Sequence, residues 1–308
     1  MLRSGSDCSG KFTIRLKFTG AELNSSRVRT PAEILALQKS GDGIKVYQLQ
    51  GNLTFTTAEA VVRDVMECFD ATQQLILDFK RVLTLNESAC RLFYELLTKL
   101  ATHNKPVLFT HTAHVRLLAR YMKIKLGKRF EKVYRSFDDN DLALEWCENR
   151  LLEKILPASR TGRRAKIAEY ELCKNFSVPE LKIFNSFLKR QNYKAGDTII
   201  HIGDEAKEIF LLARGCVSVI IPQENGARRR LATFSAGMVF GEMAAIDMAP
   251  RSAMIVADTD VECDVLSLEN FERLGVCHPS PKIKLLKNLT LSLSRRLRKA
   301  NRELSLFD

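Results

Sequence analysis

The chain of 308 residues lacks any apolar run that approaches the roughly 18 residues of a membrane-spanning helix. Its amino-terminal segment, Met-Leu-Arg-Ser-Gly-Ser-Asp, also lacks the apolar centre of a secretory signal peptide. These two absences predict a protein that does not span a membrane and that lies in the cytoplasm.

Paired metal-binding or redox cysteines are missing as well. The eight cysteines stand singly, with no Cys-x-x-Cys pair, so we expect reduced thiols and no disulfide framework. The one close histidine pair, His111 and His114, has no acidic or thiol neighbour in the sequence. No metal site is predicted.

Sequence motifs of the common catalytic centres do not occur either. There is no Gly-rich phosphate loop G-x-x-x-x-G-K-S/T and no glycine pattern of a nucleophile elbow. One Ser-x-x-Lys spacing, Ser186 to Lys189, falls in an expected helix, and such a spacing arises by chance. We therefore predict no catalytic residue in this chain.

The positive charge is the strongest compositional bias. The net charge is +12 and the isoelectric point is about 9.4, with basic clusters at 160–166, 228–230 and 295–302. These clusters are not interleaved with aromatic residues, and no helix-turn-helix follows the expected last helix. We expect no DNA binding, and we interpret the charge as solvated faces or a docking surface for an acidic protein.

The second half of the chain has the pattern of a small antiparallel β-roll. Short apolar segments alternate with glycine-containing turns. The expected strands cover 198–201, 208–213, 216–222, 228–234, 252–257 and 261–267. A helix from Ile283 to Leu306 is expected to follow, with an apolar stripe and an opposite basic face.

The most informative segment lies within this roll, at 240–253, and reads Phe-Gly-Glu-Met-Ala-Ala-Ile-Asp-Met-Ala-Pro-Arg-Ser-Ala. A cyclic phosphate needs a guanidinium group and free backbone amides, which Arg251 and a helical turn after Gly241 can provide. A ribose hydroxyl needs an acceptor, which Glu242 can provide. The alternative interpretation is an ordinary surface ion pair between Glu242 and Arg251.

This segment resembles the phosphate-binding segment of the cyclic nucleotide-binding domain family, which reads F-G-E, a short apolar helix and P-R-S/T-A. The resemblance implies that Glu242 binds the ribose hydroxyl and that Arg251 and Ser252 bind the phosphate. The implied ligand-binding residues are Gly241, Glu242, Met243, Ala244, Arg251, Ser252 and Ala253. The implied ligand is cyclic AMP (cAMP) or cyclic GMP (cGMP), and the alternative is a roll that has lost its ligand.

The first half alternates strands and amphipathic helices, which is typical of a layered α/β sheet. The expected strands cover 44–50, 74–79, 106–110 and 133–137, and the expected helices cover 57–69, 87–102, 113–126 and 139–152. The run from Leu75 to Ala89 resembles the STAS domain, which also forms the tails of sulfate permeases. In one branch of that family a serine phosphorylation site falls on Ser88, but here Glu87 adjoins it, which disfavours an incoming phosphate.

The order of these domains, with the segment 143–152 and the basic run 160–166, resembles the C-terminal regulatory region of bacterial serine-type glutaminases. We expect an N-terminal extension at 1–42 that is the remnant of a preceding domain, a STAS-like domain at 43–156, a basic linker at 157–168 and a cyclic nucleotide-binding domain at 169–308. The expected fold is α/β plus mainly β: a STAS-like α/β sandwich, then a cyclic nucleotide-binding β-roll with a long C-terminal helix.

The predicted function is a regulatory module that senses a cyclic nucleotide and signals through a STAS interaction domain, without a catalytic centre of its own. The expected partners are the nucleotide, a second copy of the chain bound through the C-terminal helix, and a protein bound by the STAS domain. Two alternatives remain open. One is a truncated or fragmentary glutaminase, and the other is a STAS adaptor with a vestigial nucleotide site.

Overall fold

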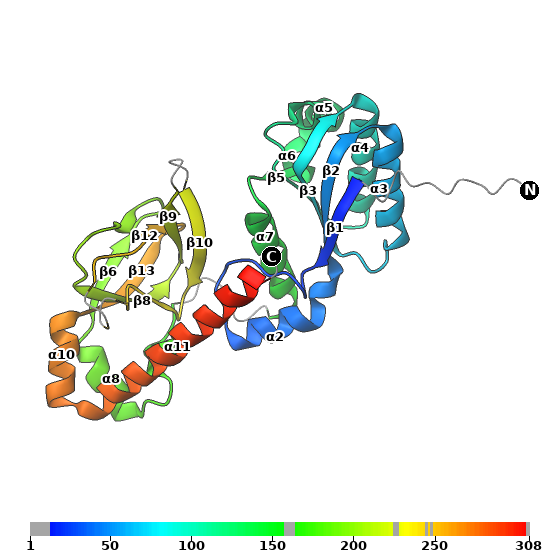
Figure 1. Cartoon of the computed structure of the whole chain (residues 1–308). Helices are drawn as coiled ribbons and strands as arrows, with labels where there is room; N and C mark the ends of the chain where they lie inside the picture. Colours follow the sequence, from blue (N-terminus) through cyan, green and yellow to red (C-terminus); the bar gives the residue numbers. More distant parts are fainter. Residues whose placement is uncertain (1–12, 157–163, 224–227, 244–245, 247–248, 306–308) are drawn as a thin grey trace, which may run out of the picture. The chain divides into compact units, whose positions relative to one another are not determined.

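The computed structural model describes residues 13–156, 164–223, 228–243, 246 and 249–305. The chain divides into two compact units, Met1–Ser159 and Arg160–Asp308 (Figure 1). None of the helices in the described part of the chain combines the length and the apolar character needed to cross a membrane.

The described residues of the first unit form a five-stranded sheet in the order β1-β2-β3-β4-β5. β1 runs antiparallel to β2, and the remaining neighbours are parallel. The strands are β1 (Ile14–Thr19), β2 (Ile44–Leu53), β3 (Gln74–Leu85), β4 (Val107–Thr110) and β5 (Arg135–Phe137). The helices are α2 (Pro31–Ser40), α3 (Phe55–Glu67), α4 (Glu87–Thr102), α5 (Arg116–Leu126), α6 (Phe130–Val133) and α7 (Asn140–Ile155).

Helices cover both faces of this sheet (Figure 1). Along β3, Leu75 and Leu77 belong to the core beneath α3, α4 and α5, whereas Ile76 belongs to the core beneath α2 and α7. This alternation follows from the two-residue period of a strand. Because apolar side chains are needed on both faces, Leu75, Ile76 and Leu77 follow one another in β3, and this short apolar run predicts a buried strand in a layered α/β fold. That prediction is confirmed.

The structure places the described part of the expected N-terminal extension inside the first unit. β1 forms the antiparallel edge of the sheet, and α2 contributes Leu37 to the core with α7. Thr30 caps α2, and its side chain and that of Glu33 form a reciprocal capping box. The predicted boundary between residues 42 and 43 therefore does not coincide with a division between compact units, because residues before it complete the sheet and one face of its core.

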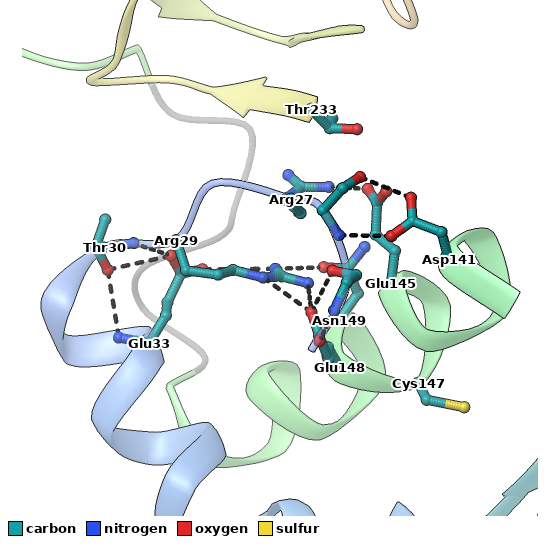
Figure 2. Close-up of polar contacts among 12 residues, drawn as sticks. Arg27, Arg29, Thr30, Glu33, Asp141, Glu145, Cys147, Glu148, Asn149 and Thr233 are labelled. Atoms are coloured by element: carbon teal, nitrogen blue, oxygen red, sulfur yellow. Dashed lines mark hydrogen bonds and ion pairs between the residues drawn. The ribbon is translucent and has the colours of Figure 1, made fainter. Parts of the chain in front are cut away.

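A buried carboxylate on α7 holds the segment between β1 and α2 in place. Glu148 is fully buried and accepts hydrogen bonds from the Ser25 amide and hydroxyl, both at 2.6 Å. The Arg29 guanidinium donates to the same carboxylate at 2.5 Å and to the Asn149 side chain at 2.7 Å (Figure 2). A buried charge needs this full set of partners, so the contacts fix the position of the segment on α7.

Two neighbouring carboxylates of α7 extend the contact. Asp141 accepts from the Ser26 amide at 2.5 Å and its hydroxyl at 2.7 Å, and Glu145 pairs with Arg27 at 2.7 Å (Figure 2). These residues are four apart on the helix, as is needed for side chains that share one helical face.

We expect Glu148→Ala to lower the free energy of unfolding of the first unit by about 3 to 5 kcal/mol, because Arg29 would stay buried without its carboxylate. Unfolding in urea, followed by the fluorescence of Trp146, measures this unit, since Trp146 is the single tryptophan of the chain. Glu153→Ala, on the exposed side of the same helix, is the control and is expected to change stability by less than about 0.5 kcal/mol. Equal effects of the two substitutions would show that the buried contacts do not hold the segment.

The described residues of the second unit form two antiparallel sheets, ordered β10-β9-β12-β7 and β11-β8-β13-β6. The strands are β6 (Lys189–Tyr193), β7 (Thr198–Ile200), β8 (Glu208–Arg214), β9 (Cys216–Pro222), β10 (Arg228–Ser235), β11 (Val239–Phe240), β12 (Met254–Ala257) and β13 (Val261–Ser267). The helices are α8 (Val178–Ser186), α10 (Leu268–Cys277) and α11 (Pro279–Ser305). The predicted β-roll with a long final helix is confirmed (Figure 1).

The expected basic linker is only partly described, since 157–163 lie outside the described residues. The remainder of it belongs to the second unit. Arg164 pairs with the buried Asp264 at 2.9 Å, and the Ala165 amide donates to the Ala213 carbonyl at 2.7 Å. Residues 164–168 therefore pack onto the roll, because they satisfy a buried carboxylate and a strand carbonyl.

The apolar stripe predicted for the final helix consists of Ile283, Leu286, Leu289, Leu293 and Leu297. The buried face of α11 differs from it. Leu285, Leu289 and the polar Asn288 and Ser292 are buried, whereas Ile283, Leu286 and Leu297 are exposed by 65%, 39% and 63%. The offset has a polar cause. The Asn288 amide donates to the carbonyls of Leu172 and Lys174 at 2.8 and 2.9 Å, which turns this face toward the roll.

Two serines considered in the sequence occupy ordinary helical positions. The Ser186 hydroxyl donates to the Ile183 carbonyl at the end of α8, and Lys189 lies in β6, so the Ser-x-x-Lys spacing does not fall on one helix. Ser88 is exposed at the second position of α4, directly after Glu87, and Asn86 caps that helix.

Candidate nucleotide-binding site

A pocket of about 180 Å³ opens in the second unit between β7, β9, β12 and the segment that follows β11. Six of the seven residues predicted to bind a ligand line it: Gly241, Glu242, Met243, Arg251, Ser252 and Ala253. The seventh, Ala244, lies outside the described residues. The apolar wall consists of Ile200, Val219, Phe234, Phe240 and Ile255.

Gly241 is required by the geometry of the pocket. Its φ of +72° lies in the left-handed region, and a Cβ at this position would lie 2.8 Å from Nη1 of Arg251. Only glycine combines this backbone conformation with so close an approach of the guanidinium group.

Arg251 is held by backbone carbonyls. Its guanidinium donates to the Gly241 carbonyl at 2.7 Å and to the Glu208 carbonyl at 2.8 Å. Among the described residues no carboxylate forms an ion pair with it, and partial burial lowers the pKa of Arg251. Arg251 is therefore a positioned cation at the pocket whose charge lacks a carboxylate partner.

Glu242 does not pair with Arg251, so the alternative of a surface ion pair between them is wrong. The Glu242 side chain is buried, with 3% exposure for the residue, and its carboxylate accepts from Nη1 of Arg296 at 2.6 Å. Arg296 lies on α11 and also lines the pocket. The cation that pairs with the predicted ribose-binding carboxylate thus comes from the final helix.

Arg296 has three further contacts on the roll. Its Nη2 pairs with Glu171 at 3.0 Å and donates to the Val239 carbonyl at 2.9 Å, and its guanidinium lies 4.6 Å from the centre of the Phe234 ring. These contacts come from separate segments, so one side chain links α11 to the pocket wall and to the segment before α8.

The sequence did not predict the roles of Arg296 and Glu171, because Arg296 lies in the basic cluster interpreted as solvated. A signal was available in the helical spacing. Leu285, Leu289 and Arg296 stand at i, i+4 and i+11, which places them on one face of a helix. Recognising Arg296 as part of that face also requires knowing that the buried carboxylate of Glu242 lies beside it, which the sequence does not show.

Burial raises the pKa of Glu242, and the positive charge of Arg296 opposes that rise. Glu171 adds a second negative charge nearby and raises it further. An ionised carboxylate accepts through both of its oxygens, and the positive charge of Arg296 favours that ionised form.

Comparison with protein families matches both units. Residues 190–275 match the model described as "Cyclic nucleotide-binding domain", and residues 37–138 match the STAS domain. The chain is a STAS domain followed by a cyclic nucleotide-binding domain. The predicted order of the two domains is confirmed.

Among curated proteins, glutaminase 2 and glutaminase 1 of Bradyrhizobium diazoefficiens are each 29% identical to this chain over 92% of its length. The match covers 45% of each relative and falls in its C-terminal part, so the chain spans less than half the length of these relatives. The cyclic AMP receptor protein of Thermus thermophilus is 35% identical over 42% of this chain and 57% of its own length.

The same comparison among solved structures finds the catabolite activator protein of Thermus thermophilus. It is 33% identical, covers 44% of this chain and 62% of its own, and superimposes with a TM-score of 0.41. In the described residues of our chain, no group of three or more metal-ligating side chains lies close together.

We expect Arg296→Gln to destabilise the cyclic nucleotide-binding domain by about 3 kcal/mol at pH 8, because Glu242 would be buried without its cation. The pKa of Glu242 is already raised in the folded state and would rise further in this variant. At low pH the Glu242 carboxyl of the variant is protonated and neutral, so its burial costs little and the variant stays stable. As the pH rises through the raised pKa the group ionises, and the free energy of unfolding of the variant falls.

Scanning calorimetry between pH 5 and pH 8 measures this change. The stability difference between wild type and Arg296→Gln should widen with increasing pH. Arg298→Gln, two residues further on and exposed, is the matched control and should leave the profile unchanged. A difference that stays constant with pH would rule out Arg296 as the partner that keeps Glu242 ionised.

Proposed function

We propose that the second unit binds a cyclic nucleotide, cAMP or cGMP, and that the chain is a regulatory module that couples this binding to its STAS domain. The observation that carries the proposal is the position of Arg251. It is a cation fixed at the pocket by two carbonyls, without a carboxylate partner among the described residues. A cyclic phosphate, which carries one negative charge, supplies the missing counter-charge.

The other pocket residues suit the rest of such a ligand. Glu242 accepts from the ribose 2′-hydroxyl, and the Ser252 hydroxyl and backbone amides near Gly241 donate to the phosphate. Ile200, Val219 and Phe234 provide an apolar surface for a flat base. Neither cAMP nor cGMP is favoured by these contacts.

The regulatory step in this proposal runs through Arg296. A hydroxyl that donates to Glu242 changes the environment of the Glu242–Arg296 pair, and Arg296 lies on α11. Ligand binding therefore shifts the population of conformations in which α11 is docked on the pocket.

Arg251→Ala is expected to weaken cyclic nucleotide binding by at least about 30-fold, because the ligand phosphate would lose its paired charge. Calorimetric titration of the purified chain with cAMP and with cGMP measures the affinity. Arg229→Ala is the control, since Arg229 is an exposed arginine outside the pocket, and it should bind as wild type does.

The 2′-deoxy analogue tests Glu242 in the same assay, because it would leave the buried carboxylate short of a donor. Wild type should bind it about 5- to 100-fold more weakly than the cyclic ribonucleotide. Equal binding by Arg251→Ala and wild type would contradict the role of Arg251 as the phosphate partner. Absence of binding by wild type would favour the adaptor with a vestigial site.

We also propose that α11 pairs with α11 of a second copy. One stripe of α11 has residues at alternating steps of three and four, which is the spacing of a coiled-coil seam. It consists of Ile283, Leu286, Thr290, Leu293 and Leu297. Three of these apolar side chains are exposed by 39% to 65%, on a face other than the one that packs on the roll. Pairing would bury this stripe in a homodimer.

Sedimentation equilibrium is expected to give a dimer for wild type and a monomer for Leu297→Glu, because a charge in the seam would be buried without a partner. Leu291→Glu is the matched control. Leu291 is exposed by 51% on the same helix but lies outside the stripe, so this variant should remain dimeric. A wild-type monomer at micromolar concentration would contradict the pairing.

The similarity to glutaminases suggests the activity that this module regulates. Both domains match those relatives in one continuous alignment. We therefore propose that the STAS domain contacts a glutaminase-type catalytic domain, and that the nucleotide sets the strength of that contact.

A further inference from the structure

The first unit contains a second pocket, which the proposed nucleotide sensing does not use. It has a volume of about 220 Å³ and lies at the amino ends of β4 and β5, beside α7. The turn before β4 contributes Asn104 and Lys105, and the segment around β5 contributes Lys132 and Arg135. The side of α7 contributes Trp146 and Arg150.

The charge of this pocket is entirely positive. Its lining contains two lysines and two arginines, and it contains no aspartate or glutamate. Within the described residues, no carboxylate lies within ion-pair distance of Lys132, Arg135 or Arg150. The Lys105 ammonium donates to the Phe69 carbonyl, outside the lining. The three other cations around the hollow repel one another, so an anion in the hollow would stabilise the arrangement.

Arg150 is positioned and has an unused donor. Its Nη2 donates to the Asn104 side chain at 3.0 Å, whereas its Nε is enclosed and has no hydrogen-bond partner. A buried donor without an acceptor is unfavourable and is rare in folded proteins. That Nε is closed off from the pocket, so an oxyanion there would accept from the Nη groups of Arg150, which the Asn104 contact holds at the pocket wall.

Trp146 orients the two arginines. The guanidinium of Arg135 lies 4.9 Å from the centre of the indole ring, and that of Arg150 lies 5.6 Å from it. Stacking on an aromatic ring fixes the plane of a guanidinium group, and two planar forks fixed in this way suit the oxygens of a tetrahedral anion.

We propose that this pocket binds a small phosphate monoester. Guanidinium groups bind phosphate oxygens in pairs, and a monoester carries nearly two negative charges at neutral pH, which matches the cluster of cations. The apolar part of the lining, with Leu97, Val107 and Val133, leaves a surface for the organic group of the ester. A cavity volume of about 10 to 15 Å³ is enough for one water molecule, so this pocket has room for several heavy atoms.

This ligand differs from a cyclic nucleotide, whose phosphate is a diester with one negative charge and two non-bridging oxygens. The site also lies in the other unit of the chain. The two pockets share no lining residue, so each proposal is tested by its own variants and the two fail separately.

The fluorescence of Trp146 reports on this pocket directly, because the chain has no other tryptophan. The full chain is titrated at pH 7.5 with inorganic phosphate, glycerol 3-phosphate and dimethyl phosphate, with the ionic strength held constant by sodium chloride. We expect a saturable change in emission with the first two ligands. The diester should bind at least tenfold more weakly, because it has one charge fewer.

Calorimetric titration with glycerol 3-phosphate tests the residues. Arg150→Gln and Lys132→Gln are expected to weaken binding at least tenfold. Lys132 is exposed and its substitution leaves the core unchanged, so a loss of binding in that variant is not a folding defect. Arg120→Gln, an exposed arginine outside the pocket, is the control and should bind as wild type does.

Three results would overturn the proposal. The first is an emission change that sodium chloride reproduces at the same ionic strength. The second is equal binding by Lys132→Gln and Arg120→Gln. The third is a chain that does not bind glycerol 3-phosphate but sediments with phosphatidic acid vesicles, when Lys132→Gln abolishes this sedimentation. That result would assign the cations to a lipid headgroup.

Discussion

The burial of the Glu242 carboxylate is the constraint on which the arrangement of the cyclic nucleotide-binding domain depends. A carboxylate with 3% exposure is stable in its ionised form only beside a cation, and Arg296 supplies that cation from the final helix. The same arginine contacts Glu171 and the Val239 carbonyl, so α11, the pocket wall and the segment before α8 meet at one guanidinium group. Any ligand group that binds Glu242 therefore acts on the pair that joins the pocket to α11.

The STAS domain contains a similar contact with a different consequence. Glu148 is also fully buried, but its partners, the backbone and hydroxyl of Ser25 and the guanidinium of Arg29, belong to the segment between β1 and α2. The contact closes one face of the sheet, and none of these residues lines either pocket. The buried carboxylate of Glu148 thus joins α7 to the amino-terminal segment of its unit, and that of Glu242 joins the pocket to α11.

The two pockets show how partner chemistry separates a binding cation from a structural one. Arg296 has two carboxylate partners, and its charge is satisfied within the protein. Among the described residues, no carboxylate forms an ion pair with Arg251 or Arg150. Arg251 donates to two backbone carbonyls, and Arg150 donates to the Asn104 side chain. Carbonyl and amide oxygens orient a guanidinium without neutralising it, which leaves the charge available to an anion.

Local sequence was sufficient for the elements and for most residues that line the pocket of the second unit. The apolar run of β3, the glycine-punctuated strands of the roll and the segment from Gly241 to Ala253 depend on spacing and backbone preference, which act between neighbours in the chain. Only the tertiary structure decided the partner of Glu242, the place of residues 13–42 in the first unit, the buried face of α11 and the cation cluster around Trp146. Each of these brings together residues that are far apart in the sequence, and the energy of a buried charge depends on which distant groups fold against it.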